Sequence, residues 1–156
     1  MRRLFGLLAV AFVVALASAG VAGASTTVAW KATFPEPFGG PVNSPFNCSG
    51  SSCGSGQVVP LGQAQDVIVF SGAGGVRTLT FADGSTIVMD EVFSNFQFPG
   101  KSVVPPTSYG APLTLDLSDT IVGGTGRFAG ASGSASGQVK LAGGTAIINL
   151  SGTVTF

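Results

Sequence analysis

The chain has 156 residues, a formal net charge of zero and no histidine. The absence of histidine excludes Ser-His-Asp and Cys-His catalysis and removes the usual ligands of catalytic zinc, copper and non-haem iron. We therefore expect no metal site and no cofactor. Its few basic residues are scattered, whereas nucleic-acid binding needs clustered phosphate contacts, so we expect no nucleic acid as a partner.

The first 24 residues have the pattern of a signal peptide. Arg2 and Arg3 give a positive start, residues 4–16 are an apolar run, and Ala22-Gly23-Ala24 provides the small residues that signal peptidase recognises. We expect a secreted or otherwise extracytoplasmic protein, cleaved after Ala24. The mature part, residues 25–156, has five basic and seven acidic residues, a net charge of −2, and the length of one domain.

Alternation of apolar and polar residues predicts strands from the start of the mature chain. Val28, Trp30, Ala32 and Phe34 share one face of the first strand. The next predicted strand, residues 66–71 (DVIVFS), is nearly all apolar, which is typical of a more buried strand.

A hairpin follows in the middle of the chain. Residues 76–82 and 85–98 flank Asp83-Gly84, a strong turn signal. Residues 113–122 then alternate again, with leucines at every second position.

Two long connections interrupt this pattern. Residues 35–56 are rich in proline, glycine and serine, and we expect a loop packed over one end of the domain. This loop holds the only cysteines, Cys48 and Cys53, whose spacing in an exported protein predicts a local structural disulfide. Residues 99–112 form the second connection.

The last part of the chain predicts a hairpin. Residues 131–141 alternate between small or apolar residues and serine, glutamine or lysine, and residues 145–156 repeat that alternation after an Ala-Gly-Gly turn at 142–144. With the earlier strands, this predicts an all-β fold, a single antiparallel barrel of about eight strands, with a β-sandwich as the alternative.

The glycine-rich stretch GGTGRFAGASGSASG, residues 123–137, resembles a phosphate-binding loop at first sight. Such a loop needs a helix N-terminus directly after the glycines. The residues that follow here alternate as a strand, and each interior glycine would destabilise a helix by about 1 kcal/mol. We therefore expect no nucleotide, and we assign these glycines to a turn and to close packing.

The segment IVGGTGRFAGASGSASG, followed by INLSGTVTF, resembles the C-terminal signature of small exported bacterial barrels of unassigned function. It is also similar to the GGTG-x-F segment of dirigent proteins and, more distantly, to the allene oxide cyclase barrel. The resemblance implies an eight-stranded antiparallel barrel with a central apolar cavity. It also implies that the matching motif residues serve the turn and its packing: Gly123, Gly124, Gly126, Phe128 and Gly130. No dirigent catalytic acid matches a position of this chain.

The first functional hypothesis is a non-enzymatic exported barrel that binds an apolar small molecule or lipid in its interior. It rests on the barrel pattern, the scarcity of charge and five phenylalanines: Phe70, Phe81, Phe93, Phe96 and Phe98. The competing interpretation, which we favour from the sequence, is a barrel filled by its own side chains.

Two further functions remain open. A cofactor-free cyclase or isomerase of the dirigent type would need a buried carboxylic acid, for which Asp66, Asp90 and Glu91 are the candidates. Asp66 shares a face with Ile68 and Phe70, and one of the two adjacent acids must point inward in a regular strand. An outer-membrane barrel is the last alternative, because Leu150, Val154 and Phe156 resemble a terminal membrane strand.

Overall fold

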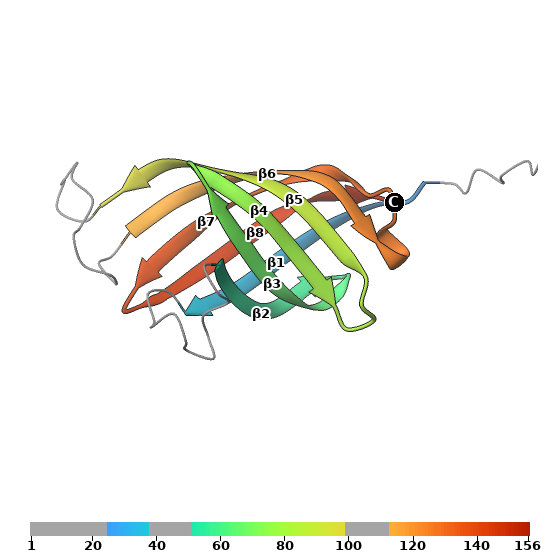
Figure 1. The fold of residues 1–156 in the computed structure, drawn as a ribbon, viewed down its shortest axis with the longest axis horizontal. Coiled ribbons are helices and arrows are strands. Elements are labelled where there is room, and N and C mark those ends of the chain that lie inside the picture. Colours follow the sequence, from blue (N-terminus) through green and yellow to red (C-terminus); the bar gives the residue numbers. More distant parts are fainter. Residues whose placement is uncertain (1–24, 38–50, 99–112) are drawn as a thin grey trace, which may run out of the picture.

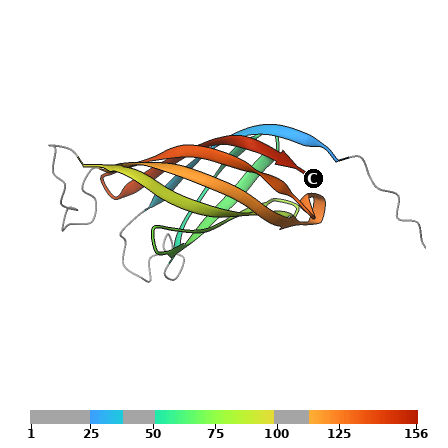
Figure 2. The same cartoon turned by 90° about the horizontal axis from the view of Figure 1, so that it is seen from above.

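Eight antiparallel strands close into a barrel in the computed structural model of the chain, which describes residues 25–37, 51–98 and 113–156 (Figure 1). Each strand pairs with its neighbours in sequence, and β8 pairs with β1 to complete the barrel, whose curved wall is visible in Figure 2. The strands are β1 (Thr27–Pro37), β2 (Ser51–Val59), β3 (Gly62–Ser71), β4 (Gly74–Phe81), β5 (Thr86–Gln97), β6 (Leu113–Thr125), β7 (Ser132–Ala142) and β8 (Thr145–Thr155). The predicted all-β barrel of about eight strands is confirmed, and the β-sandwich alternative is wrong.

The predicted strand faces are largely those observed. Trp30, Ala32 and Phe34 of β1 point into the barrel, as do Ile148, Leu150 and Val154 of β8. Asp83-Gly84 connects β4 to β5, and Gly143-Gly144 connects β7 to β8. One expectation for β3 is wrong: it is not more buried than its neighbours, because Val69 and Phe70 are 54% and 43% exposed.

The predicted loop at 35–56 is shorter than expected at both ends. Residues 35–37 belong to β1 and residues 51–56 to β2, and the part between lies outside the described residues. The glycines of β2 are the physical reason. A Cβ on Gly56 would lie 2.0 Å from the carbonyl oxygen of Thr33, so the close pairing of β2 with β1 requires a residue without a side chain.

The GGTGRF motif closes one end of the barrel. Gly126 has a φ of 59° and begins a short 3₁₀ helix, η1 (Gly126–Phe128), that leads into β7. The ring of Phe128 is fully buried, with its centroid 4.8 Å from that of Phe81 and 5.0 Å from that of Phe156. We call this the closed end, defined by Phe81, Phe128 and Phe156.

The guanidinium of Arg127 covers the closed end from outside. It lies 5.0 Å from the ring centre of Phe81 and 4.7 Å from that of Phe128, within the range of cation–π contact. Arg127 also donates to the carbonyl oxygen of Leu61 at 2.7 Å. The motif thus joins β4, β6 and β7 through packing. In the described part of the chain, no helix is long and apolar enough to cross a membrane.

Candidate functional site

Five charged side chains from five different strands are buried inside the barrel. Each occupies an inward position in its strand, and each is at most 3% exposed. They are Glu36 of β1, Asp66 of β3, Arg77 of β4, Glu91 of β5 and Asp119 of β6.

Arg77 is the centre of this charged cluster. Its Nε donates to Oε2 of Glu91 at 2.6 Å and its Nη2 to Oε1 of the same carboxylate at 3.1 Å, a bidentate pair. Its Nη1 donates to Oε1 of Glu36 at 3.0 Å and also to Oδ2 of Asp66. Arg77 is the only buried basic side chain among the residues that the structure describes.

The cluster contains four acids and one base, and the pKa values of two of the acids are raised. Burial raises the pKa of Asp66 well above its usual value, against the attraction of Arg77 and with the further repulsion of Glu36 and Glu91. Burial and the neighbouring Glu91 raise the pKa of Asp119 to about 8. Both oxygens of Asp119 lack a hydrogen-bond partner among the described residues. Near neutral pH Asp119 therefore holds a proton, and the environment of Asp66 favours its neutral form.

The environment of Arg77 favours its charged form, whereas the environment of the two aspartates favours their neutral form. Burial disfavours its charge, but the carboxyls of Asp66, Glu91 and Glu36 more than compensate and raise the pKa of Arg77 above its usual value. The guanidinium is thus a permanent cation held by three acids. This network also fixes the inward faces of four strands relative to one another.

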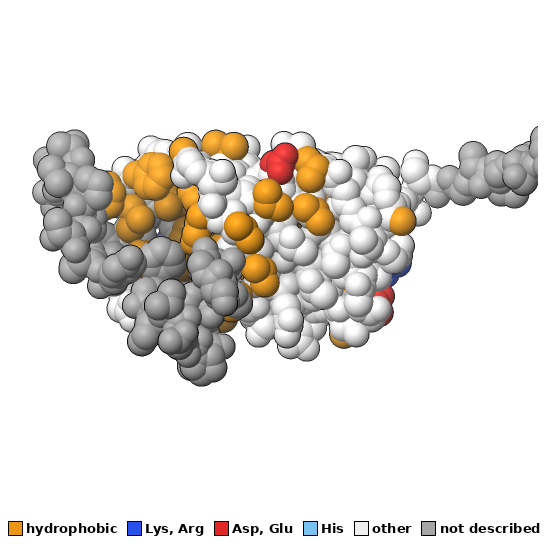
Figure 3. Space-filling view, in the orientation of Figure 1, with side chains coloured by type: hydrophobic (Ala, Val, Ile, Leu, Met, Phe, Trp, Pro, Cys, Tyr) orange, Lys and Arg blue, Asp and Glu red, His pale blue; other side chains and the backbone are white. Residues whose placement is uncertain are grey.

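A cavity of about 220 Å³ opens beside this cluster, at the end of the barrel opposite the closed end. Ten of its twelve lining residues are apolar, and Glu36 and Arg77 are the two polar ones. The apolar lining consists of Ile68, Phe70, Phe93, Phe96, Leu113, Leu115, Val139, Leu141, Ala146 and Ile148. We call this the open end. On the face shown in Figure 3, hydrophobic side chains gather toward it.

A β-bulge brings two of the predicted phenylalanines into the same cavity. Phe93 and Phe96 are three residues apart, so in a regular strand they would point to opposite faces. The register between β5 and β6 shifts between Ser94 and Gln97, which inserts one extra residue, and Asn95 there has a φ of 52°. After this shift Phe96 faces the cavity, and Phe70 lies across from Phe93 with ring centres 6.0 Å apart.

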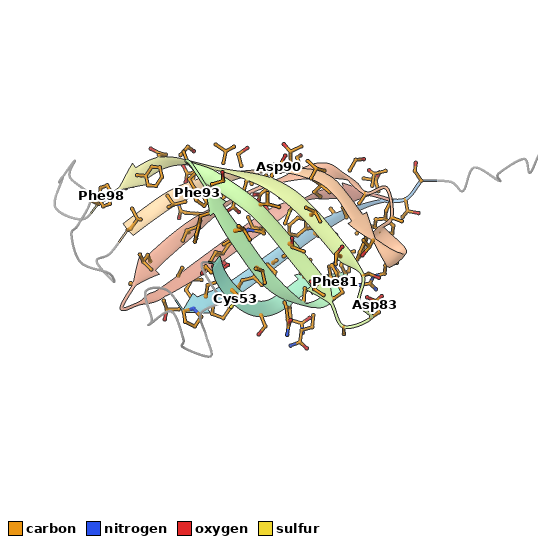
Figure 4. The ribbon with its side chains drawn as sticks, in the orientation of Figure 1. Cys53, Phe81, Asp83, Asp90, Phe93 and Phe98 are labelled. Carbon is orange, nitrogen blue, oxygen red and sulfur yellow. The ribbon has the colours of Figure 1, made fainter. Side chains whose placement is uncertain are left out.

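Of the other predicted acids and phenylalanines, some lie inside the barrel and some outside it. Asp66 and Glu91 are in the charged cluster, whereas Asp90 points away from the barrel and is exposed (Figure 4). Phe81 lies at the closed end, far from the cavity that Phe93 lines (Figure 4). Phe98 borders a separate surface pocket with Leu113 and Leu141. Cys48 lies outside the described residues, so the disulfide with Cys53 stays a prediction.

Sequence reasoning missed three members of the charged cluster: Glu36, Arg77 and Asp119. The signal was present in the alternation. Glu36 continues the inward series of β1, Arg77 precedes Leu79 and Phe81 on one face of β4, and Asp119 follows the alternating leucines of β6. Charged residues are usually placed in solvent, and here alternation outweighs that preference.

Comparison of the chain with models of protein families, with curated proteins and with solved structures gave no match.

Proposed function

We propose that the mature chain is an exported barrel that binds a small apolar molecule in the open-end cavity. The observation that carries this proposal is the cavity itself, with its ten apolar lining residues and two polar ones. Pockets of this composition, apolar with a few polar groups, are typical of small-molecule sites. The exposed fractions of Phe70 and Phe96, 43% and 48%, place apolar rings at its mouth.

The size of the cavity limits the ligand. An apolar protein cavity of about 150 Å³ accommodates benzene. The cavity here, about 220 Å³ and open at one side, suits a compact molecule of one or two rings or a short alkyl chain. The resemblance to dirigent proteins and allene oxide cyclase, which implies a central apolar cavity, supports the same proposal.

Two measurements test this function. The mature protein, purified from the host that exports it, is analysed by native mass spectrometry for a co-purified molecule, and naphthalene binding is followed by fluorescence. Ala146→Trp fills the cavity and is expected to abolish both signals. The matched control is Ile147→Trp, which introduces the same ring at the adjacent, outward position of β8. Equal naphthalene binding by the two variants would refute the cavity as the site.

A cofactor-free isomerase or cyclase is the second candidate. It is favoured by one observation: the cavity wall includes Glu36, and burial raises the pKa of the nearby Asp66. A carboxyl held in an apolar site can exchange a proton with a bound substrate. Glu36→Gln should then retain a co-purified ligand but stop its conversion to an isomer, as measured by chromatography of the extracted molecule. Conversion at the wild-type rate would refute this role.

The outer face of β7 and β8 gives less support to the outer-membrane alternative than the exposed valines of β3–β6 do. Ser134, Ser136, Ser151 and Thr153 form adjacent exposed pairs on the outside of β7 and β8. A lipid-facing barrel presents an apolar band at such positions. We therefore favour a ligand bound inside the barrel over a barrel surrounded by membrane lipid.

A further inference from the structure

We propose that the cavity selects ligands with a cationic, amine-type head and rejects the fatty acid of the same chain length. This inference rests on the proposed binding function and specifies the class of ligand. It follows from the position of Glu36 and Arg77 as the two polar residues of an otherwise apolar wall.

Arg77 does not offer a site for a ligand carboxylate. All three of its guanidinium nitrogens already donate to buried carboxyl oxygens of Glu36, Asp66 and Glu91. These bonds use four of the five guanidinium N–H groups, so a fatty acid could gain a bidentate contact only by displacing one of these acids and leaving it buried without its partner. Breaking a buried ion pair in this way is strongly unfavourable.

Glu36 can accept a further hydrogen bond. A carboxylate has room for about four hydrogen bonds, and its Oε1 receives one from Arg77. An ammonium or amine head that enters the cavity would meet this acceptor, while the alkyl or ring part contacts Phe93, Phe96 and Leu115.

The charge of the whole cluster favours the same ligand. Glu36, Asp66, Glu91 and Asp119 face a single cation, Arg77. Burial is the main cause of the raised pKa values of Asp66 and Asp119, and repulsion from the neighbouring carboxyls Glu36 and Glu91 adds to it. A ligand anion would add repulsion in a site of low dielectric constant, and a ligand cation would supply the missing charge.

A cationic ligand should also release protons. The added positive charge lowers the pKa of both aspartates, and Asp119, with a pKa of about 8, releases part of its proton when the amine binds near neutral pH. A neutral ligand of the same length leaves their pKa unchanged and releases none. Proton release therefore separates recognition by charge from simple apolar burial.

The experiment compares octylamine, octan-1-ol and octanoate as competitors of naphthalene on the mature protein near neutral pH, where the amine and the acid are ionised. We expect octylamine to displace naphthalene at a concentration at least about tenfold lower than octanoate, with octanol between them. Calorimetry in two buffers of different ionisation enthalpy should show proton release with octylamine and none with octanol.

Two variants test whether Glu36 causes the preference for octylamine. Glu36→Gln should bring octylamine and octanol to the same affinity relative to naphthalene. Asp90→Asn removes one negative charge from the outside of the same barrel and is the matched control, expected to preserve the wild-type order. If Glu36→Gln does not fold, the relative affinities of the three ligands and the proton release of the wild-type protein test the inference.

The outcomes distinguish the two proposals. Octanoate binding as tightly as octylamine, with naphthalene bound, overturns the amine inference and leaves the binding function in place. Octylamine binding without proton release also overturns it. If naphthalene itself does not bind, the proposed function fails, and the amine inference fails with it.

Discussion

Different kinds of side chain fill the interior of the barrel at its two ends. At the closed end, the rings of Phe81, Phe128 and Phe156 occupy the interior, and none of the buried charged side chains in the described part of the chain lies among them. Toward the open end, strands of the same barrel place four acids and Arg77 inside and leave a cavity beside them. An interior built only for stability has no need of this second arrangement, because well-packed apolar residues are often as stable as a buried ion network. This difference is the reason for placing the proposed binding function at the open end.

The largest effect is expected from Arg77→Met. This substitution leaves four buried carboxyls without a cation, and removal of one partner of a buried pair costs about 3–5 kcal/mol. Urea unfolding should show this loss at neutral pH, with partial recovery in acid as the carboxyls take up protons. Lys140→Met, which removes a positive charge at an exposed position of β7, is the control and should change stability little. Similar stability of the two variants would contradict the central role of Arg77.

Phe128→Ala tests the closed end. Removal of this fully buried ring leaves a cavity between Phe81 and Phe156, and the free energy of unfolding should fall by about 3 kcal/mol. Phe96→Ala, at the mouth of the open end, removes a ring that is 48% exposed and should change stability far less. If thermal unfolding shows equal losses, the two ends do not differ in the way described.

Gly133→Val tests the close packing of β7 and β8. Gly133 has a φ of 145°, and a Cβ there would lie 2.2 Å from the carbonyl oxygen of Thr153. Strain of this kind costs about 1–3 kcal/mol, so the variant should unfold at a lower temperature. Ser134→Val, at the adjacent exposed position, is the control and should be tolerated. A Gly133→Val protein of wild-type stability would show that the glycine is not needed.

The pH dependence of stability tests the interior acid Asp119. The pKa of Asp119 is raised in the folded state to about 8, so the folded protein binds a proton that the unfolded chain releases above its ordinary value of 3.8. The free energy of unfolding should therefore fall as pH rises between these values, by on the order of 1 kcal/mol per pH unit. Asp119→Asn should reduce this slope in urea titrations at several pH values, and Asp66, whose pKa is also raised, should maintain the remainder.

Asp116→Asn provides the contrast to Asp119→Asn. Hydrogen bonds from Asn95 and Gln138 lower the pKa of Asp116, so its contribution is present above the ordinary value and is lost as pH falls. The two variants should thus change the pH dependence in opposite directions. A shared direction would contradict the placement of one acid inside and the other outside the barrel.

Alternation in the sequence predicts much of the candidate site, although three of its members were not recognised. Asp66 and Glu91 were among the predicted acids, and Phe70, Phe93 and Phe96 of the cavity were among the predicted phenylalanines. Glu36, Arg77 and Asp119 follow the same period, but a charge in solvent is the ordinary expectation for each. Phe96 could not be placed by period at all, because a bulge changes its face.

The sequence by itself determined the class of fold, the inward face of β1, β6, β7 and β8, and the turns at Asp83-Gly84 and Gly143-Gly144. These follow from local rules: a period of two and the backbone freedom of turn residues. Only the tertiary structure decided that β8 closes on β1, that the glycine-rich residues 51–56 form a strand, and that five charges meet in one interior. The physical reason is that closure of the barrel sets which residues of distant strands become neighbours, and no local pattern contains that information.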